Sequence, residues 1–379
     1  MENTSKTVLW IVVVLVVVLG AYYFMAKGPS ETGPIKIGFI SPLTGDAAVY
    51  GEVVRDVEKL AVEEINAGGG INGRQVEGIY EDGKCSGSGA ANAMQKLVNA
   101  DKVKIVIGGF CSSESLAAVP IATQNKVFLF SPGSSSPDLT NVSKYFARNY
   151  PSDASQGSVL AGVAYNQKNW RKIAFIQEQL DYPLGIFKAF SAEFEKMGGK
   201  VIKEEFATSV TDFRSQLTKL KAENPDALFI DTQTPAAADR ILKQLQDLKW
   251  KPALLVSDAV SGDTATVKKD ASILEGALAA EFGVDPANQK YQHHLQAYKE
   301  KYGKDANFTS YTQTIYDSVY MIRDAVVAVG YDGTKVANWV RSAKDWPGAS
   351  GLVTIKADGD RAGGHVPKVI KNGKVELLK

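Results

Sequence analysis

Short, continuous apolar runs alternate with segments of helical periodicity along most of the chain. IKIGFI (35–40) and VKIVIGG (103–109) are apolar at nearly every position, which is typical of parallel strands buried on both faces of a sheet. The same pattern predicts further strands at 76–80, 126–131, 171–177, 200–206, 227–231 and 253–257. Apolar residues spaced three and four apart predict helices at 50–67, 90–100, 113–125, 153–166, 184–196, 212–223, 235–248, 289–302 and 312–329.

The alternation restarts after Pro151, so we expect an α/β fold with two open, parallel lobes. The chain has 379 residues and 45% hydrophobic content, enough for two ordinary domains. Ligands of such sheets bind at the carboxyl ends of the strands, and a cleft between two lobes closes by a hinge motion. In the tail, Asp358-Gly359 and Asn372-Gly373 predict hairpin turns.

The stretch NAGGGINGR (66–74) spells G-x-G-x-x-G, the letters of a dinucleotide-binding loop. Such a loop follows a strand and opens a helix. Here a helix (50–67) comes first and a strand (76–80) follows, so the order is reversed. We therefore expect a helix C-cap and a turn, and no nucleotide cofactor.

Residues 8–26 form an uninterrupted apolar run. At about 1.5 Å per residue the run reaches roughly 28 Å, close to the thickness of a bilayer core. A secretory signal usually has an apolar region of only about 7–15 residues, and no convincing cleavage site follows. An uncleaved transmembrane anchor is the favoured interpretation, and a long cleaved signal peptide is the alternative. A polar linker, KGPSETGP (27–34), comes next.

Charge and motif content exclude several classes of function. The 43 basic and 42 acidic residues give a net charge of +1 without a basic stripe, which argues against a nucleic-acid partner. The adjacent His293 and His294 diverge by about 100° on a helix and cannot share a metal ion. A hydrolase using Ser112 or Ser135 lacks a positioned base, since His365 lies in the turn-rich tail. We expect a binding protein, neither an enzyme nor a metal protein.

Cys85 and Cys111 are the only cysteines. Two free buried thiols are one interpretation. An exporting N-terminus favours a disulfide instead. The bond would close a loop of about 27 residues, worth roughly 3–4 kcal/mol, and would place the domain outside the cytoplasm.

Loops rich in hydroxyl groups follow several predicted strands. In GGFCSSESL, Ser112 and Ser113 stand where a helix begins, with Glu114 in its first turn. Serine there is a common N-cap, but the free N–H groups and the helix dipole also suit a carboxylate. SPGSSSPDLT (131–140) carries five hydroxyls, and Asp258 directly follows an apolar strand. Loops of this kind at neighbouring strand ends predict a ligand site.

These motifs resemble those of the substrate-binding proteins of branched-chain amino acid ABC importers, which have the type I periplasmic binding fold. The resemblance runs from Ile35 to about Asp360. It rests on IGFISPLTGDAAVYG, AVEEINAGGGINGRQVE, the two cysteines, CSSES, FLFSPGSSSPDLT and LDYPLG. It implies two Rossmann-like lobes joined by a three-strand hinge. The implied boundaries are an anchor and linker at 1–34, lobe 1 at 35–152 plus 281–364, and lobe 2 at 153–280 plus 365–379.

The resemblance also implies ligand contacts in the first lobe. Ser112 matches a serine that holds the ligand carboxylate. Ser134 would offer its backbone carbonyl to the ligand ammonium, and Ser135 its hydroxyl and N–H to the carboxylate. Tyr50 matches an aromatic residue that contacts the ligand side chain.

In the second lobe, Tyr182 matches a ligand-binding tyrosine, and Asp258 falls where the family has an acid that pairs with the ammonium. Gln233 and Thr234 stand where branched-chain binders show aromatic residues. This departure argues against a purely aliphatic ligand.

The expected function is therefore that of an extracytoplasmic binding protein, anchored to the cytoplasmic membrane by residues 8–26. It would bind a small zwitterion, an amino acid, by hinge closure and deliver it to an ABC permease. A ligand-sensing receptor ectodomain of the same fold is one alternative, disfavoured because no apolar span follows the domain. A binder of an amide or small carboxylate is another.

Overall fold

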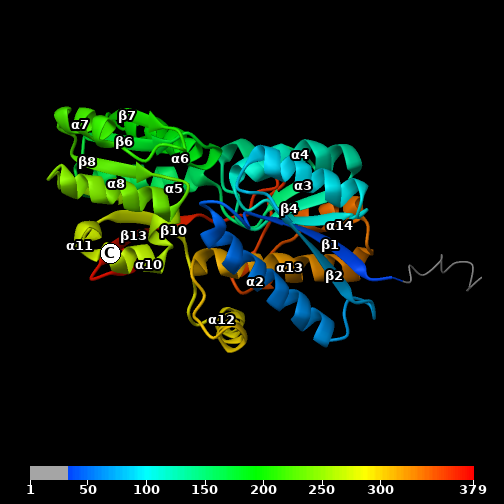
Figure 1. The fold of residues 1–379 in the computed structure, drawn as a ribbon. Coiled ribbons are helices and arrows are strands. Elements are labelled where there is room, and N and C mark those ends of the chain that lie inside the picture. The colour runs from blue at the N-terminus through cyan, green and yellow to red at the C-terminus, as the bar shows by residue number, and fades with distance from the viewer. Residues whose placement is uncertain (1–32) are drawn as a thin grey trace, which may run out of the picture. The chain divides into compact units, whose positions relative to one another are not determined.

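Two large sheets organise residues 33–379, the part of the chain that the structure, a computed structural model, describes (Figure 1). The first contains five parallel strands in the order β2-β1-β3-β4-β5. They are β1 (Ile35–Ser41), β2 (Val76–Asp82), β3 (Ile105–Gly108), β4 (Phe128–Ser131) and β5 (Phe146–Arg148). Its helices are α2 (Ala48–Ala67), α3 (Gly87–Asn99), α4 (Ser112–Asn125), α12 (Gln289–Tyr302), α13 (Thr309–Val329) and α14 (Gly333–Arg341). We call this assembly lobe 1.

Seven strands form the second sheet, in the order β14-β13-β10-β9-β8-β6-β7. They are β6 (Lys172–Glu178), β7 (Lys200–Phe206), β8 (Ala227–Asp231), β9 (Ala253–Val256), β10 (Leu278–Phe282), β13 (His365–Lys371) and β14 (Lys374–Leu377). Strands β6 to β10 run parallel to one another, and β13 and β14 add an antiparallel edge. Its helices are α5 (Asp153–Gly162), α6 (Asp181–Lys196), α7 (Arg214–Ala222), α8 (Pro235–Asp247), α9 (Asp258–Ser261), α10 (Thr264–Lys269) and α11 (Ala271–Leu274). This assembly is lobe 2.

The chain passes between the two sheets three times. It leaves lobe 1 after β5, returns after β10, and enters lobe 2 again at β13. The predicted boundary at 280/281 falls inside β10, which ends at Phe282. The crossing comes slightly later because the strand continues in register with β13 to its last residue.

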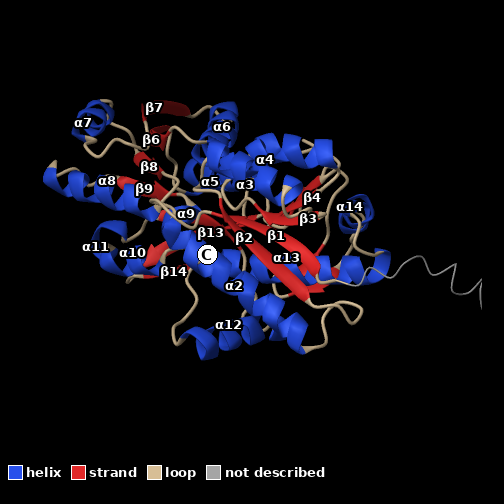
Figure 2. Cartoon of the chain, turned by 45° about the vertical axis from the view of Figure 1, so that its right-hand side comes forward, coloured by secondary structure: helices blue, strands red, loops and turns tan. Residues whose placement is uncertain are grey.

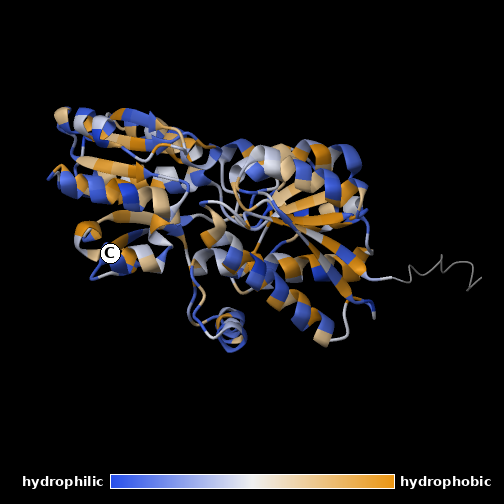
Figure 3. Ribbon diagram, in the orientation of Figure 1, coloured by the Kyte–Doolittle hydropathy of each residue, from blue (hydrophilic) through white to orange (hydrophobic). Residues whose placement is uncertain are grey.

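The central strands of each sheet are buried as their apolar sequences require, whereas the edge strands β2 and β7 are mostly half-buried or exposed. Every residue of β3, β4 and β8 is buried. Figure 2 shows these strands (red) with helices (blue) on both sides of each sheet. In Figure 3 the strands are largely hydrophobic, while polar residues line the outer faces of the helices. Both faces are covered, so continuous apolar runs are the stable pattern.

The glycine-rich stretch is a helix-to-strand turn, as predicted. Helix α2 ends at Ala67 and β2 begins at Val76. Gly70 has a φ of +76°, and a Cβ there would lie 2.0 Å from the Arg74 carbonyl oxygen. Only glycine fits this close approach. The Asn66 side chain bonds both backbone groups of Val76, which closes the turn.

The C-terminal prediction is confirmed at one turn and revised at the other. Asn372 and Gly373 join β13 and β14 as a two-residue hairpin, both with positive φ. Asp358-Gly359 instead lies in a loop closed by an isolated bridge between Ile355 and Arg361. The sequence reasoning also missed β5, β10, α14, the short helices α9–α11, and a two-stranded hairpin of β11 (Trp346–Gly348) and β12 (Gly351–Val353).

The predicted anchor at 8–26 lies outside the described residues. Among residues 33–379, no helix combines the length and the apolar character needed to cross a membrane.

Candidate ligand-binding site

A small, nearly filled cavity of about 10 Å³ lies between residues of the two lobes. It is lined by buried residues that are mostly aromatic or polar: Tyr50, Phe110, Cys111, Ser112, Gly133, Ser135, Tyr182, Gln233, Ala259 and Tyr311. Larger hollows exist elsewhere, for example beside Trp250 on lobe 2. Five of the nine predicted site residues line the small cavity instead. It lies at the carboxyl ends of strands, where open α/β sheets bind ligands.

Ser112 is the first residue of α4 and contributes its side chain to the lobe 1 wall. Its Oγ accepts hydrogen bonds from the backbone N–H groups of Ser135 (3.3 Å) and Ser136 (3.0 Å). Both lone pairs are then engaged, so the hydroxyl proton remains to be donated. A hydroxyl donor at a helix N-terminus is suited to bind an anionic ligand group.

The two serines of the neighbouring loop have different surroundings. Ser135 lines the cavity. The hydroxyl of Ser134 lies inside lobe 1 instead, donating to the Gly109 carbonyl (2.8 Å) and lying 2.7 Å from the hydroxyl of Ser115. The Ser134 side chain therefore holds the loop against α4, and only its backbone is left for the predicted role.

Ser113 does not line the cavity. Its hydroxyl donates a 2.6 Å hydrogen bond to Asp181 at the start of α6. Successive residues of a helix point about 100° apart, so only one of the pair Ser112 and Ser113 can face the ligand. Ser113 instead joins lobe 1 to lobe 2.

Glu114 turns away from the cavity and supports the disulfide. Its carboxylate accepts the backbone N–H groups of Cys85 (2.9 Å) and Cys111 (3.0 Å). Burial raises the pKa of Glu114 to about 8, although these hydrogen bonds lower it. At neutral pH the carboxyl is therefore largely protonated and competes little with an anion at the N-terminus of α4.

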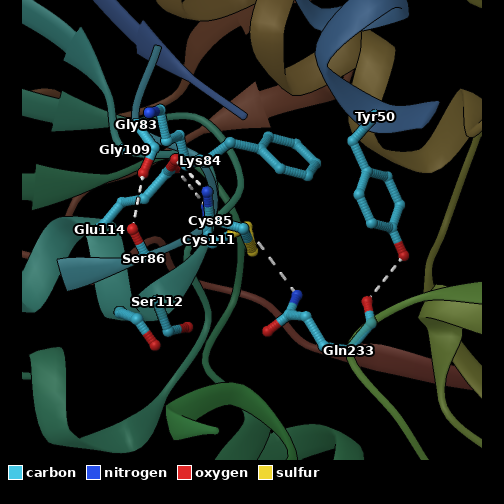
Figure 4. The surroundings of a disulfide bond; sticks show 12 residues. Tyr50, Gly83, Lys84, Cys85, Ser86, Gly109, Cys111, Ser112, Glu114 and Gln233 are labelled. Atoms are coloured by element: carbon cyan, nitrogen blue, oxygen red, sulfur yellow. Dashed lines mark hydrogen bonds between the residues drawn. A yellow bond between two sulfur atoms is a disulfide. The ribbon is translucent and has the colours of Figure 1, made fainter. Parts of the chain in front are cut away.

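The predicted disulfide between Cys85 and Cys111 is present, with a Cα–Cα distance of 5.2 Å. It ties the segment before α3 to the residue before α4. Figure 4 shows the side chain of Gln233 pointing at it from lobe 2, with Nε2 3.9 Å from Cys111 Sγ. The disulfide thus forms part of the cavity wall as well as a structural link.

Gln233 follows β8, and both of its backbone groups are held. Its N–H donates to Glu178 (2.9 Å), and its carbonyl accepts the Tyr50 hydroxyl from lobe 1 (3.0 Å; Figure 4). Thr234 does not line the cavity. Its hydroxyl caps α8 by accepting the Ala237 N–H (3.3 Å), so its role is structural.

Asp258 begins α9 and is completely buried. Its Oδ1 accepts the Tyr182 hydroxyl, and its Oδ2 accepts the hydroxyls of Tyr150 (2.6 Å) and Tyr311 (2.8 Å). Burial raises the pKa of all three tyrosines well above the ordinary value, and the charge of Asp258 raises it further. They remain protonated donors, and they occupy three of about four acceptor positions on the carboxylate.

Two further carboxyl groups lie buried in lobe 2, Asp153 in the first turn of α5 and Asp231 at the end of β8. Burial raises the pKa of both well above the ordinary value; nearby Asp258 adds to the shift at Asp153, and Asp153 adds to that at Asp231. These shifts favour the protonated, uncharged form of both carboxyl groups.

The family model described as periplasmic binding protein matches residues 34–366. The chain belongs to the periplasmic binding protein family.

Several relatives share this family and its fold. The "Leu/Ile/Val-binding protein homolog 2" of Brucella abortus is 28% identical over 342 residues, covering 89% of this chain and 90% of its own length. The crystal structure of the leucine-binding protein LivK from Thermotoga maritima is 29% identical, with a TM-score of 0.84, and covers 91% and 98% of the two chains. LivJ of Streptococcus pneumoniae, solved in complex with isoleucine, is 28% identical, with a TM-score of 0.81 and the same coverage.

Membership of the periplasmic binding protein family implies an extracytoplasmic location. The Cys85–Cys111 disulfide is consistent with it, because disulfides persist in oxidising compartments.

In this periplasmic binding protein the sequence reasoning missed three aromatic residues at the site. Phe110 and Tyr311 line the cavity, and Tyr150 contacts Asp258 behind it. The Phe110 and Tyr311 rings lie 5.2 Å apart, and those of Tyr150 and Tyr311 lie 4.4 Å apart. Phe110 follows β3 directly and could have been found as a strand-end residue. Tyr150 and Tyr311 come from a crossing segment and a returning helix, which carry no local signal.

Proposed function

We propose that the chain binds an α-amino acid in the interlobe cavity and delivers it to a membrane permease of an ABC importer. The observation that carries the proposal is the arrangement of Ser112 and Asp258. A hydroxyl donor at a helix N-terminus belongs to one lobe, and a buried carboxylate beside the same cavity belongs to the other. A zwitterion complements both.

In this arrangement the ligand carboxylate accepts the Ser112 hydroxyl proton at the N-terminus of α4. Ser135, which also lines the cavity, lies within the same wall. Hydrogen bonds to a charged group are worth about 1.5–3 kcal/mol each, and the helix dipole adds to them.

The ligand ammonium pairs with Asp258. Oδ1 accepts one hydrogen bond and Oδ2 two, so Oδ1 keeps an acceptor position for the ammonium. A buried carboxylate needs a counter-charge, and no cationic residue lines the cavity among the described residues. The ligand supplies it.

Closure follows from the division of these groups between lobes. Neither lobe alone satisfies both ends of a zwitterion, so the ligand shifts the population towards the closed state. Contacts across the lobes support closure: Tyr50 with Gln233, Ser113 with Asp181, and an ion pair of Lys188 with Asp138 at 3.3 Å. We propose that residues 8–26 anchor the protein in the membrane, which would raise its effective concentration at the permease.

The relatives support an amino acid. The Thermotoga protein is named for leucine, and the Streptococcus protein was solved with isoleucine. A hydrolase is not supported, because among the described residues no histidine lines the cavity beside Ser112.

A thermal-shift screen of residues 33–379 against the common amino acids, amides and small carboxylates tests the proposal. A ligand present at 100 times its Kd stabilises the folded state by about 2.7 kcal/mol. We expect at least one amino acid to raise the melting temperature and to be recovered unchanged by mass spectrometry. Ser112→Ala should weaken its binding roughly 10- to 150-fold, and Ser88→Ala, on the exposed side of α3, should not. Stabilisation only by amine-free ligands, or a converted ligand, would contradict the proposal.

A further inference from the structure

We infer that the site selects amino acids whose side chain carries a hydroxyl or a carboxamide, and that Gln233 is the residue that determines this specificity. The inference rests on the proposed function, because it assumes an α-amino acid in the interlobe cavity.

The carboxamide of Gln233 is nearly unpartnered although the residue is buried. Among residues 33–379 it makes one hydrogen bond, from Nε2 to Cys111 Sγ at 3.9 Å, which is long even for sulfur. The side chain is only 7% exposed. An amide offers two donor hydrogens and an oxygen with two lone pairs, so most of this capacity is unused at the cavity.

The backbone that carries this amide is held from both lobes. The N–H of Gln233 is held by Glu178 and the carbonyl by Tyr50, which belong to opposite lobes. Closing the lobes therefore sets the carboxamide against the Cys111 side of the cavity, as Figure 4 shows. A polar group held in this way is suited to recognition, because little freedom is lost when it binds.

The apolar part of the cavity wall is mainly aromatic. Among the described residues, no leucine, isoleucine, valine or methionine lines it. The apolar surface near Gln233 comes from the rings of Tyr50 and Phe110, whose centroids lie 5.4 Å apart. These rings can pack against the carbon atoms of a short ligand side chain, while Gln233 provides a polar edge.

The two charged ends of the ligand are assigned to Ser112 and Asp258, so Gln233 faces the remaining part, the side chain. Gln233 lines the cavity, so a ligand bound there comes within reach of the carboxamide. A branched aliphatic side chain would leave the amide buried and unpaired. Sites built to hydrogen-bond a substrate group discriminate strongly against the analogue that lacks it.

Isothermal titration with two pairs of similarly shaped ligands tests the inference. Threonine and valine differ by a hydroxyl in place of a methyl group, and asparagine and leucine by a carboxamide in place of an isopropyl group. We expect the wild-type protein to bind the polar member of at least one pair roughly tenfold or more tightly. Gln233→Leu should abolish or reverse that preference. Gln246→Leu, an exposed glutamine of α8, is the matched control and should retain it.

The outcomes separate the two proposals. If valine and leucine bind the wild-type protein as tightly as their polar partners, the inference is wrong and the proposed function stands. If Gln233→Leu keeps the polar preference and its normal thermal unfolding, Gln233 is not the determinant. If none of the four amino acids binds, the inference is wrong, and the full thermal-shift screen decides the proposed function separately.

Discussion

The hydroxyl of Tyr50 in lobe 1 donates a 3.0 Å hydrogen bond to the backbone carbonyl of Gln233 in lobe 2. The bond joins α2 to the loop after β8 directly at the cavity wall. The Tyr50 ring also packs on Phe110 (5.4 Å) and Phe308 (4.7 Å) of lobe 1. One side chain therefore lines the cavity, belongs to the core of one lobe and bonds the other lobe.

Tyr50→Phe should weaken amino-acid binding while leaving the fold intact. It keeps the ring contacts and removes one neutral hydrogen bond that exists only in the closed state, worth about 1 kcal/mol or roughly fivefold in affinity. The matched control is Tyr302→Phe, which removes a 2.9 Å bond to the Asp56 carbonyl within lobe 1. Calorimetric titration should show a loss for Tyr50→Phe only. Equal losses would mean that the cross-lobe bond does not contribute to closure.

Asp258→Asn should reduce amino-acid affinity roughly 30-fold or more, since removing one member of a buried charged pair costs about 2–5 kcal/mol. Asparagine keeps the shape and can still bond the surrounding tyrosines, so the protein should fold. An amine-free acid with the same side chain as the best ligand is the control. It should bind both proteins alike in calorimetric titration. Unchanged amino-acid affinity would remove Asp258 from the ammonium site.

The disulfide should make a substantial contribution to stability. Replacing Cys85 and Cys111 by serine releases a loop of about 27 residues, and the chain-entropy model gives a loss of roughly 3–4 kcal/mol in the free energy of unfolding. Urea denaturation of the oxidised protein and the double variant measures it. Intact-mass analysis after alkylation should find no free thiol in the oxidised protein. Two alkylated cysteines would show that the bond is absent in solution.

Glu114 should make stability fall with rising pH. Burial raises its pKa to about 8, above the value of about 4.3 in an unfolded chain. Between these values the folded state keeps a proton that the unfolded state has released. The stabilisation is complete below the unfolded pKa and is lost as pH rises through about 8.

The test compares wild type with Glu114→Gln by urea denaturation at acidic and mildly alkaline pH. His294 and His365 make the free energy of unfolding rise with pH instead, because burial lowers the pKa of each to about 4. The informative quantity is therefore the difference between the two proteins. From about pH 5 to 8 the free energy of unfolding of the wild type should fall by roughly 2–4 kcal/mol relative to the variant. Parallel pH profiles would contradict the raised pKa.

Much of the fold was predictable because its signals are local. The buried strands β3 and β8 are continuous apolar runs, and the glycines of 68–73 follow an amphipathic helix. Strand β5 was missed because it is only three residues long. Strand β10 was missed because LAAEF (278–282) has a weak apolar signature and is stabilised by pairing with β13, far along the chain.

The candidate site divides in the same way. The sequence by itself determined that Ser112 begins a helix after a strand, that the two cysteines can pair, and that Asp258 follows an apolar strand. The first and third follow from residues within a few positions, and the cysteine pairing follows from there being only two cysteines on a chain with an exporting N-terminus. Only the tertiary structure decided that the Ser113 side chain lies outside the cavity and bonds Asp181.

The tertiary structure also placed Tyr150, Tyr182 and Tyr311 around one carboxylate. These tyrosines come from a lobe crossing, the start of α6 and α13, which are brought together because the chain crosses between the two sheets three times. A buried carboxylate must find hydrogen-bond donors, but the sequence near Asp258 does not say which distant segments will supply them. That choice is made by packing between the lobes, and no local pattern encodes it.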